Sequence, residues 1–334
     1  HNQGQLALLL TNGYLHRKNF DSSLVQLRLA AEDHEVLPSM VAQVTMKVFE
    51  LIDDPIKWEQ ANQLANHWLA IYPDEPRFLA IQGDLYVSAS KMEEGQGFYL
   101  RAARMGDPKY EVWARIIQLD FELNAVDSAA IHAEEALKSF PMNGFLNFQL
   151  GFARYLQGNN PDALRYLEIA RGIIKPTDNW NVQLFSMLGD VYHAVGRPKD
   201  SDVAFDKVLA LNPTDEHVLN NYSYYLSLRK ERLEKAATMS KQLVEKFPTE
   251  GTYLDTYAWV LYQQGKYEEA LHYLSLAVAD EKSQSSAVWE HHGDAMFRLG
   301  RIKEAVESWK KAVALPNANQ LLDKKIKMKQ IVEN

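Results

Sequence analysis

A short stretch near the C-terminal end, "YEEALHYLSLAV" at residues 267–278, decides the fold of this chain. Tyr267, Leu271 and Leu274 recur at helical spacing and form one apolar stripe. A small residue, Ala270, lies on the same stripe. The pattern predicts an amphipathic helix that packs closely against a neighbouring helix at Ala270.

Small residues equivalent to Ala270 recur along the whole chain at intervals of 34 to 38 residues. A bulky side chain at such a position would hold two packed helices beyond their usual separation of about 8–10 Å, so the constraint is one of size. Nine positions imply nine repeats. They are Ser23, Ala61, Gly95, Ala129, Ala163, Ser201, Ala236, Ala270 and Ala305.

Prolines and glycines keep step with this series and predict where the helices end. A proline follows about a dozen residues after most small residues and is expected to stop a helix. A glycine precedes the small residue by five positions in four repeats, where a helix must end in a left-handed residue before the chain reverses. Each repeat is therefore predicted as helix, turn, helix, stop. The prolines are Pro38, Pro73, Pro108, Pro141, Pro176, Pro213, Pro248 and Pro316, and the glycines are Gly158, Gly196, Gly265 and Gly300.

This pattern resembles the tetratricopeptide repeat, which has a period of about 34 residues and a W-x2-L-G-x2-Y…A-x3-F…P signature. The residues that match best are Leu188, Gly189, Tyr192, Phe205 and Pro213 in the sixth repeat, and Trp289, Gly293, Ala305, Trp309 and Pro316 in the ninth. The resemblance implies an all-α fold, an α-solenoid wound as a right-handed superhelix of about nine helix-turn-helix repeats.

The register places a single array over residues 4–319, followed by a C-terminal capping helix at 320–334. Four extra residues are expected before the second repeat and four more before the sixth, at 178–181. The seventh repeat carries one extra residue in a turn without glycine, within 227–236. The repeats are expected to begin near residues 4, 42, 76, 110, 144, 182, 216, 251 and 286.

Composition excludes several classes of function. The 334 residues carry a net charge of -8, which argues against nucleic acid as a partner. No cysteine is present, so disulfides and thiolate metal sites are excluded. No apolar run approaches the roughly 20 residues of a transmembrane helix. An export signal or lipid anchor upstream of His1 is compatible with the sequence.

Two adjacent histidines in "WEHHGD" at 289–294 raise the question of a metal site. Neighbouring helical residues diverge by about 100°, so His291 and His292 cannot chelate one ion together. His291 and Asp294, at i and i+3, could do so with further ligands, which leaves a metal-dependent hydrolase or sensor as an alternative function. No HExxH spacing or other catalytic motif occurs. We therefore expect no catalytic residue, no metal and no cofactor.

The resemblance also implies a concave groove lined by the second, fifth, ninth, twelfth and thirteenth residues of each repeat. An aromatic centre with acidic residues around it suits a peptide or protein segment that carries apolar and basic side chains. The alternative is that these aromatic rings only pack against neighbouring helices. The predicted groove residues are Phe145, Phe148, Phe152, Tyr155, Asn220, Tyr224, Asp255, Trp259, Tyr262 and Asp294, with further acids at Glu50, Asp53, Asp84, Glu111, Glu122, Asp190 and Glu290.

The leading functional prediction is a non-catalytic scaffold or adaptor that binds a protein partner in this groove. Residues 219–278 are similar to tetratricopeptide proteins of bacterial cell envelopes, particularly those of the Bacteroidota. This similarity implies a location in the bacterial envelope, on the periplasmic side, with the cytoplasm as the alternative. A self-associating structural protein of the envelope is a further alternative, and the oligomeric state is left open.

Overall fold

The computed structural model describes residues 3–33, 35–105, 109–175, 177–280 and 284–332. Within these ranges the chain forms nineteen α-helices and no strand, which confirms the all-α fold class. They are α1 (Gln3–His16), α2 (Phe20–Ala31), α3 (Pro38–Phe49), α4 (Pro55–Ile71), α5 (Pro76–Ser88), α6 (Met92–Ala103), α7 (Tyr110–Glu122), α8 (Val126–Ser139), α9 (Gly144–Leu156), α10 (Asn160–Ile173), α11 (Asn181–Ala194), α12 (Pro198–Leu211), α13 (Glu216–Arg229), α14 (Leu233–Lys246), α15 (Gly251–Gln263), α16 (Tyr267–Ala279), α17 (Ser286–Arg298), α18 (Ile302–Val313) and α19 (Leu322–Met328).

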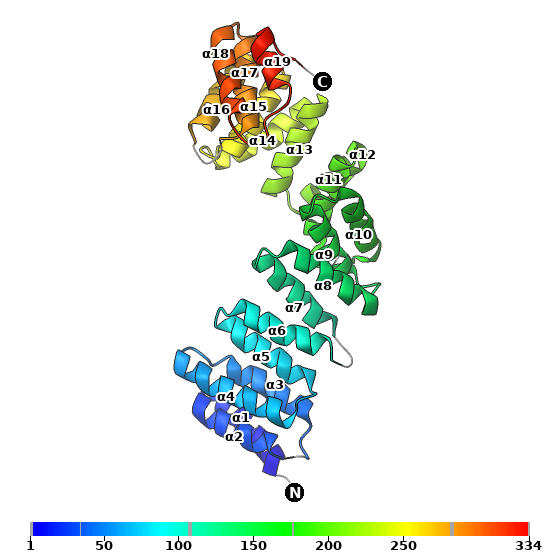
Figure 1. The fold of residues 1–334 in the computed structure, drawn as a ribbon, viewed down its shortest axis with the longest axis vertical. Helices are drawn as coiled ribbons and strands as arrows, with labels where there is room; N and C mark the ends of the chain where they lie inside the picture. The colour runs from blue at the N-terminus through cyan, green and yellow to red at the C-terminus, as the bar shows by residue number, and fades with distance from the viewer. Residues whose placement is uncertain (1–2, 34, 106–108, 176, 281–283, 333–334) are drawn as a thin grey trace. The chain divides into compact units, whose positions relative to one another are not determined.

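In the described ranges eight pairs of successive helices pack closely: α1 with α2, and α5 with α6 through α17 with α18 (Figure 1). Helix α3 packs on α2 and α5 more closely than on α4, and α19 packs on α18. The odd-numbered helix is the first of each repeat. The contacts divide the chain into an N-terminal body, residues 1–174, and a C-terminal body, residues 175–334. This division falls beside the four extra residues expected at 178–181.

The small residues lie where two helix backbones touch, as predicted. Ala163 and Ala305 are completely buried. The carbonyl oxygen of Ala163 would be 3.2 Å from a Cβ added at Gly151, and that of Ala305 would be 3.0 Å from one added at Gly293. Such distances leave little room for a side chain at Gly151 or Gly293, so the paired helices approach closely beside Ala163 and Ala305.

The turns between paired helices use the left-handed backbone that the glycine series predicted. Gly158, Gly196, Gly265 and Gly300 have φ between 74° and 80°. The equivalent position in other repeats is taken by residues other than glycine, also with positive φ. They are Lys18, Ser90, Asn124 and Lys230. The turn itself therefore requires a residue with left-handed backbone geometry, and that residue is glycine in only some repeats.

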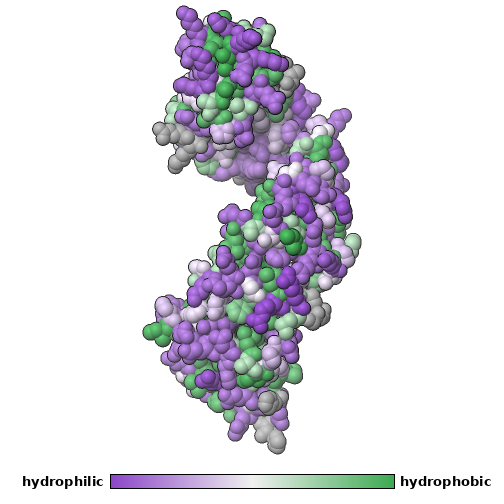
Figure 2. All heavy atoms as spheres, in the orientation of Figure 1, coloured by the Kyte–Doolittle hydropathy of each residue, from purple (hydrophilic) through white to green (hydrophobic). Residues whose placement is uncertain are grey.

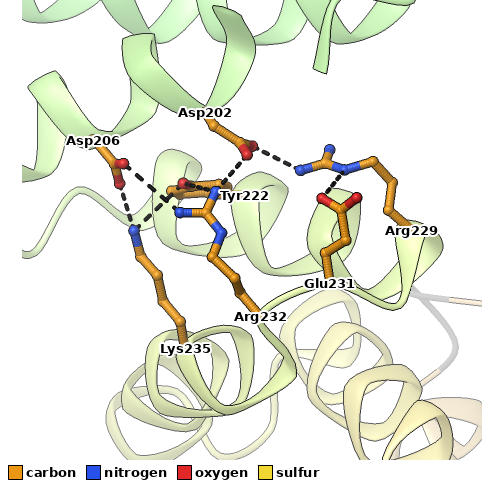
Figure 3. A network of polar contacts seen from close by, with 7 residues as sticks. All are labelled: Asp202, Asp206, Tyr222, Arg229, Glu231, Arg232 and Lys235. Carbon is orange, nitrogen blue, oxygen red and sulfur yellow. Dashed lines mark hydrogen bonds and ion pairs between the residues drawn. The ribbon is translucent and has the colours of Figure 1, made fainter. Parts of the chain in front are cut away.

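The seventh repeat, which has no glycine in its turn, is held by a network of charged side chains (Figure 3). Arg232 has φ 45°, and its guanidinium donates to the Tyr222 hydroxyl at 2.8 Å and pairs with Asp202. Arg229 also donates to Asp202, at 2.8 Å. These bonds fix the extra residue of the turn and offset the strain of a left-handed arginine.

The second repeat differs from the expected register. Helix α3 begins at Pro38, four residues before the expected start at 42, and Pro38 opens this helix instead of ending the preceding one. Proline is well tolerated at the first helical position because the N–H that it lacks has no partner there. The additional residues of this repeat lie in the linker 50–54 and in α4, which has 17 residues.

On the face drawn in Figure 2, hydrophobic residues form separate patches between hydrophilic ones. No helix in the described ranges is long and apolar enough to cross a membrane.

Candidate peptide-binding groove

The aromatic residues predicted for the centre of the groove lie on α9, in the N-terminal body. Phe148 is buried, and Phe145, Phe152 and Tyr155 are half-buried. The ring centroid of Phe152 is 4.9 Å from that of Phe121 on α7, the first helix of the preceding repeat. These rings therefore pack partly against neighbouring helices while part of their area stays at the surface.

The aromatic residues predicted in the C-terminal body form a stack. The ring centroid of Trp259 lies 4.6 Å from that of Tyr262 and 3.9 Å from that of His291, with all three rings nearly parallel. The Tyr262 hydroxyl accepts a hydrogen bond from Arg298 Nε at 3.0 Å. Trp259 and Tyr262 are only 9% and 6% exposed. Most of the area expected to anchor a ligand is thus used inside the protein.

The polar groove positions nearby are also engaged with other side chains. Asp255 lies 2.8 Å from His291 Nδ1, and Asn220 donates to the Asn221 side chain at 3.2 Å. Burial alone would lower the pKa of His291, but the charge and hydrogen bond of Asp255 raise it above the usual value. Burial raises the pKa of Tyr224, whose ring faces His291, to about 12.

Asp294 was predicted on the open groove, but the structure places its carboxylate beneath α19. Lys325 Nζ lies 2.9 Å and 2.8 Å from the two Asp294 oxygens, and Trp309 Nε1 donates to Oδ1 at 2.9 Å. Asp294 is 4% exposed. Burial raises the pKa of this carboxyl group, and Lys325 opposes that rise.

Three groove acids share one arrangement: each pairs with a basic side chain on the first helix of the following repeat, or on α19 after the ninth. Such a pair joins residues 27 to 36 positions apart, so the helical period within one repeat could not reveal it. Two of these acids therefore join successive repeats, and Asp294 joins the ninth repeat to α19. The pairs are Asp190 with His217 at 2.6 Å, Asp255 with His291 at 2.8 Å, and Asp294 with Lys325 at 2.8 Å.

The two adjacent histidines contact different helices. His292 Nδ1 lies 3.0 Å from Ser308 Oγ on α18, whereas His291 bonds to α15. Burial, with Arg301 and Lys311 nearby, lowers the pKa of His292 to about 4. Among the residues that the structure describes, no group of three or more His, Cys, Asp or Glu side chains lies close enough to hold a metal ion.

A cavity of about 610 Å³ opens in the N-terminal body on the first helices of three successive repeats, α3, α5 and α7. Its wall is largely apolar, with Met46, Ala80 and Ile81 among its residues, and Arg77 and Arg115 also line it. Once the second repeat is counted from Pro38, its second, fifth and ninth residues all line the cavity. They are Ser39, Ala42 and Met46. These are positions that the resemblance assigns to the groove, and the shifted start of this repeat left them out of the predicted groove residues.

The cavity is also lined by an acid, Asp84, whose side chain is exposed. Asp84 accepts a hydrogen bond from the Tyr99 hydroxyl, and both residues line the cavity. Partial burial raises the pKa of Asp84, although the hydrogen bond from Tyr99 and the charge of Arg115 oppose that rise. Asp84 and Glu111, two of the predicted groove acids, are therefore brought together at this cavity.

Stacked antiparallel helix pairs with small residues at their contacts define the class of α-solenoid repeat proteins. Residues 257–319 match the family model of the tetratricopeptide repeat. The chain is 22% identical over 297 residues to TPR repeat-containing protein MJ1428 of Methanocaldococcus jannaschii, an alignment that covers 71% of this chain and 50% of that protein. The chain thus spans about half the length of this relative.

Two solved structures share the fold. The crystal structure of a tetratricopeptide repeat protein from Parabacteroides merdae ATCC 43184 superposes with a TM-score of 0.56 at 13% identity, over 76% of this chain and 98% of that chain. The APC/C hetero-tetramer Cut9-Hcn1 gives a TM-score of 0.57 at 10% identity, over 93% and 63%. The chain is therefore similar to tetratricopeptide repeat proteins in its fold, and residues 257–319 match the model of that family.

Proposed function

We propose that this chain binds a segment of a protein partner in the groove of its N-terminal body. Tetratricopeptide folds serve in general as non-catalytic scaffolds for protein interactions, and a chain of this fold occurs in the Cut9-Hcn1 hetero-tetramer. The observation that carries the proposal is the 610 Å³ cavity, which collects side chains from α3, α5 and α7 on one face. A cavity of this size accommodates one or two anchoring side chains.

The lining of the cavity indicates the chemistry of the bound segment. Met46, Ala80 and Ile81 offer an apolar surface, and a methionine adapts its shape to different ligands. Glu111 and Arg77 stand among the lining residues with opposite charges. We expect an apolar anchor on the partner to supply most of the affinity, with a basic residue near Glu111 fixing its direction.

The decisive experiment fills the cavity. Ala80→Trp places a large ring among the lining residues, whereas Ile131→Trp changes an exposed residue on α8 and serves as the control. Partners are first identified by affinity capture and cross-linking, and their affinity is then measured with purified proteins. Ala80→Trp should weaken binding at least about tenfold, equivalent to about 1.4 kcal/mol, without loss of helical circular dichroism. Equal affinity for both variants would place the ligand elsewhere.

A second pair of variants separates the cavity from the aromatic residues on α9. If Phe148→Ala with Phe152→Ala weakens binding and Ala80→Trp does not, the partner contacts the fifth repeat instead of the cavity. Phe148 is buried, so circular dichroism must again show intact helices. This comparison ranks the two groove regions of the N-terminal body directly.

We further propose that the protein acts in the bacterial cell envelope, on its periplasmic side. The support is the similarity of residues 219–278 to envelope tetratricopeptide proteins. Fractionation of native cells tests this proposal, with an antibody against the protein and with marker proteins for each compartment. Recovery of the protein with the cytoplasmic markers alone would overturn it.

A further inference from the structure

The C-terminal body contains a buried ammonium group that the proposed function does not use. Lys325 Nζ lies 2.7 Å from Glu290 Oε1 and 2.8 Å from Asp294 Oδ2, and 5.9 Å from the centre of the Trp309 ring. Lys325 is only 3% exposed. Two carboxylates and an aromatic face thus form a site for a primary ammonium group, away from solvent.

The two carboxylates occupy positions that the resemblance assigns to the groove. Counted from Ser286, Glu290 and Asp294 are the fifth and ninth residues of their repeat. The segment that fills this position comes from the chain itself, and Asn319 adds a hydrogen bond to Glu290 at 3.0 Å. In its position on α17, Lys325 therefore resembles a bound ligand side chain.

The segment that carries Lys325 depends on these contacts for its structure. Helix α19 has seven residues, and a helix of that length is not stable by itself in water. Leu322 is fully buried and Ile326 packs against the same core, so these two residues flank the lysine with apolar contacts. Helix α19 packs on α18, the last helix of the array, so no contact between repeats depends on it.

Electrostatics decides what could replace α19. If Lys325 left alone, Glu290 and Asp294 would stay close together without a compensating charge, and burial already disfavours the charged form of Asp294. Covering these carboxylates without a compensating charge is costly, so a segment that replaces α19 must bring a cation of its own. A neutral or acidic segment could not take the place of α19.

We propose that the groove face of the ninth repeat is a lysine-binding site for a partner segment, and that α19 occupies this site in the free protein as a competitor. The spacing of Leu322, Lys325 and Ile326 defines the ligand: a short helix with an apolar residue three positions before the lysine and another directly after it. This site lies on helices other than those of the α3–α5–α7 cavity and goes beyond the function proposed above.

Chemical rescue tests the site in the chain of 334 residues. Lys325→Ala removes a propylammonium group, so added propylammonium should raise the melting temperature of this variant towards that of the wild type. The neutral analogue 1-propanol should not, and Lys325→Met, in which the side chain fills the space, should respond to neither. Equal responses to propylammonium and 1-propanol would show that no ammonium site exists and would overturn the proposal.

Competition with a peptide tests whether another segment can displace α19 in the wild-type protein. The probe is a synthetic peptide with the sequence of residues 318–330, "ANQLLDKKIKMKQ", and the control peptide has methionine in place of the lysine at position 325. In ¹⁵N-labelled protein, the lysine peptide should accelerate amide exchange of Leu322–Met328 in a saturable manner, and the control should not. No acceleration by the lysine peptide would show α19 to be a fixed cap. Ala80→Trp should leave this result unchanged, so the two proposals fail separately.

Discussion

At the scale of single residues, stacking depends on side chains that are small enough for two backbones to touch. Ala270 is completely buried on α16, within the apolar core of the C-terminal body. On α17, a Cβ at Gly293 would lie only 2.5 Å from Trp309, so glycine there makes room for a large ring on the paired helix. The sequence spacing predicted the first of these contacts, and the signature of the ninth repeat predicted the second.

Ala270→Leu should lower the free energy of unfolding by about 1–3 kcal/mol, because a close-packed core cannot accept the added methylene groups without shifting. The control Glu268→Gln changes an exposed side chain on the same helix and should cost less than about 0.5 kcal/mol. Urea titration followed by circular dichroism measures both. Equal midpoints for the two variants would contradict the position assigned to Ala270.

A second prediction concerns the turn of the third repeat. Ser90 has φ 61°, a left-handed conformation that glycine adopts without steric strain. Relief of a left-handed strain of about 1–2 kcal/mol exceeds the entropic cost of glycine, so Ser90→Gly should raise the free energy of unfolding by about 0.5–1 kcal/mol. The same measurement on Ser90→Ala is the control, since alanine keeps the strain and should bring no gain. A destabilised Ser90→Gly would mean that the serine side chain contributes more than the backbone strain costs.

At the scale of elements, α17 shows how much of the site the sequence could predict. Helical divergence predicted that His291 and His292 contact different neighbours, and they bond to α15 and α18. The pairing of Asp294 with Lys325 could not be predicted, because it depends on how a segment 31 residues away folds back. The start of α3 was wrong by four residues because proline can either end one helix or open the next.

The adjacent histidines of α17 should change the free energy of unfolding in opposite directions as the pH varies. His292 should determine how this free energy falls at acid pH. Its folded pKa of about 4 lies below the unfolded value of 6.5, so its contribution to stability is present above pH 6.5 and is lost as the pH falls towards 4. Replacing it by glutamine should flatten the fall in unfolding free energy across this window. The matched variant His272→Gln, at an exposed position on α16, should not. Identical acid profiles for wild type and His292→Gln would refute the prediction.

His291 should determine how the free energy of unfolding changes above pH 6.5. Its folded pKa is raised by Asp255, so the stabilisation from this pair is complete below pH 6.5 and is lost as the pH rises through the raised value. His291→Gln should remove this loss, which would make the variant less dependent on pH above 6.5 than the wild type. Urea titrations at a series of pH values measure the difference. A steeper alkaline loss in His291→Gln than in the wild type would reverse the assigned sign.

At the scale of the whole molecule, each of the two bodies should have its own stability, so that a substitution in one body has little effect on the other. In a repeat array each repeat contacts only its neighbours, so stability is approximately a sum of local terms. The chain follows this rule, because its internal contacts separate into the bodies 1–174 and 175–334. A substitution within one body should therefore weaken that body first and leave the other protected.

Amide hydrogen exchange on Ala270→Leu tests this division at residue resolution. Helices α13–α18 should exchange faster than in the wild type, because they share the disturbed core or lie next to it, while α1–α8 should keep their wild-type rates. The converse variant Ala129→Leu, at a fully buried position on α8, should accelerate exchange in the N-terminal body only. Combining the two should give costs that add within about 0.5 kcal/mol, since distant sites act independently. Faster exchange throughout the chain in either single variant would show that the array unfolds as one cooperative unit, and the division of its contacts would then have no counterpart in its stability.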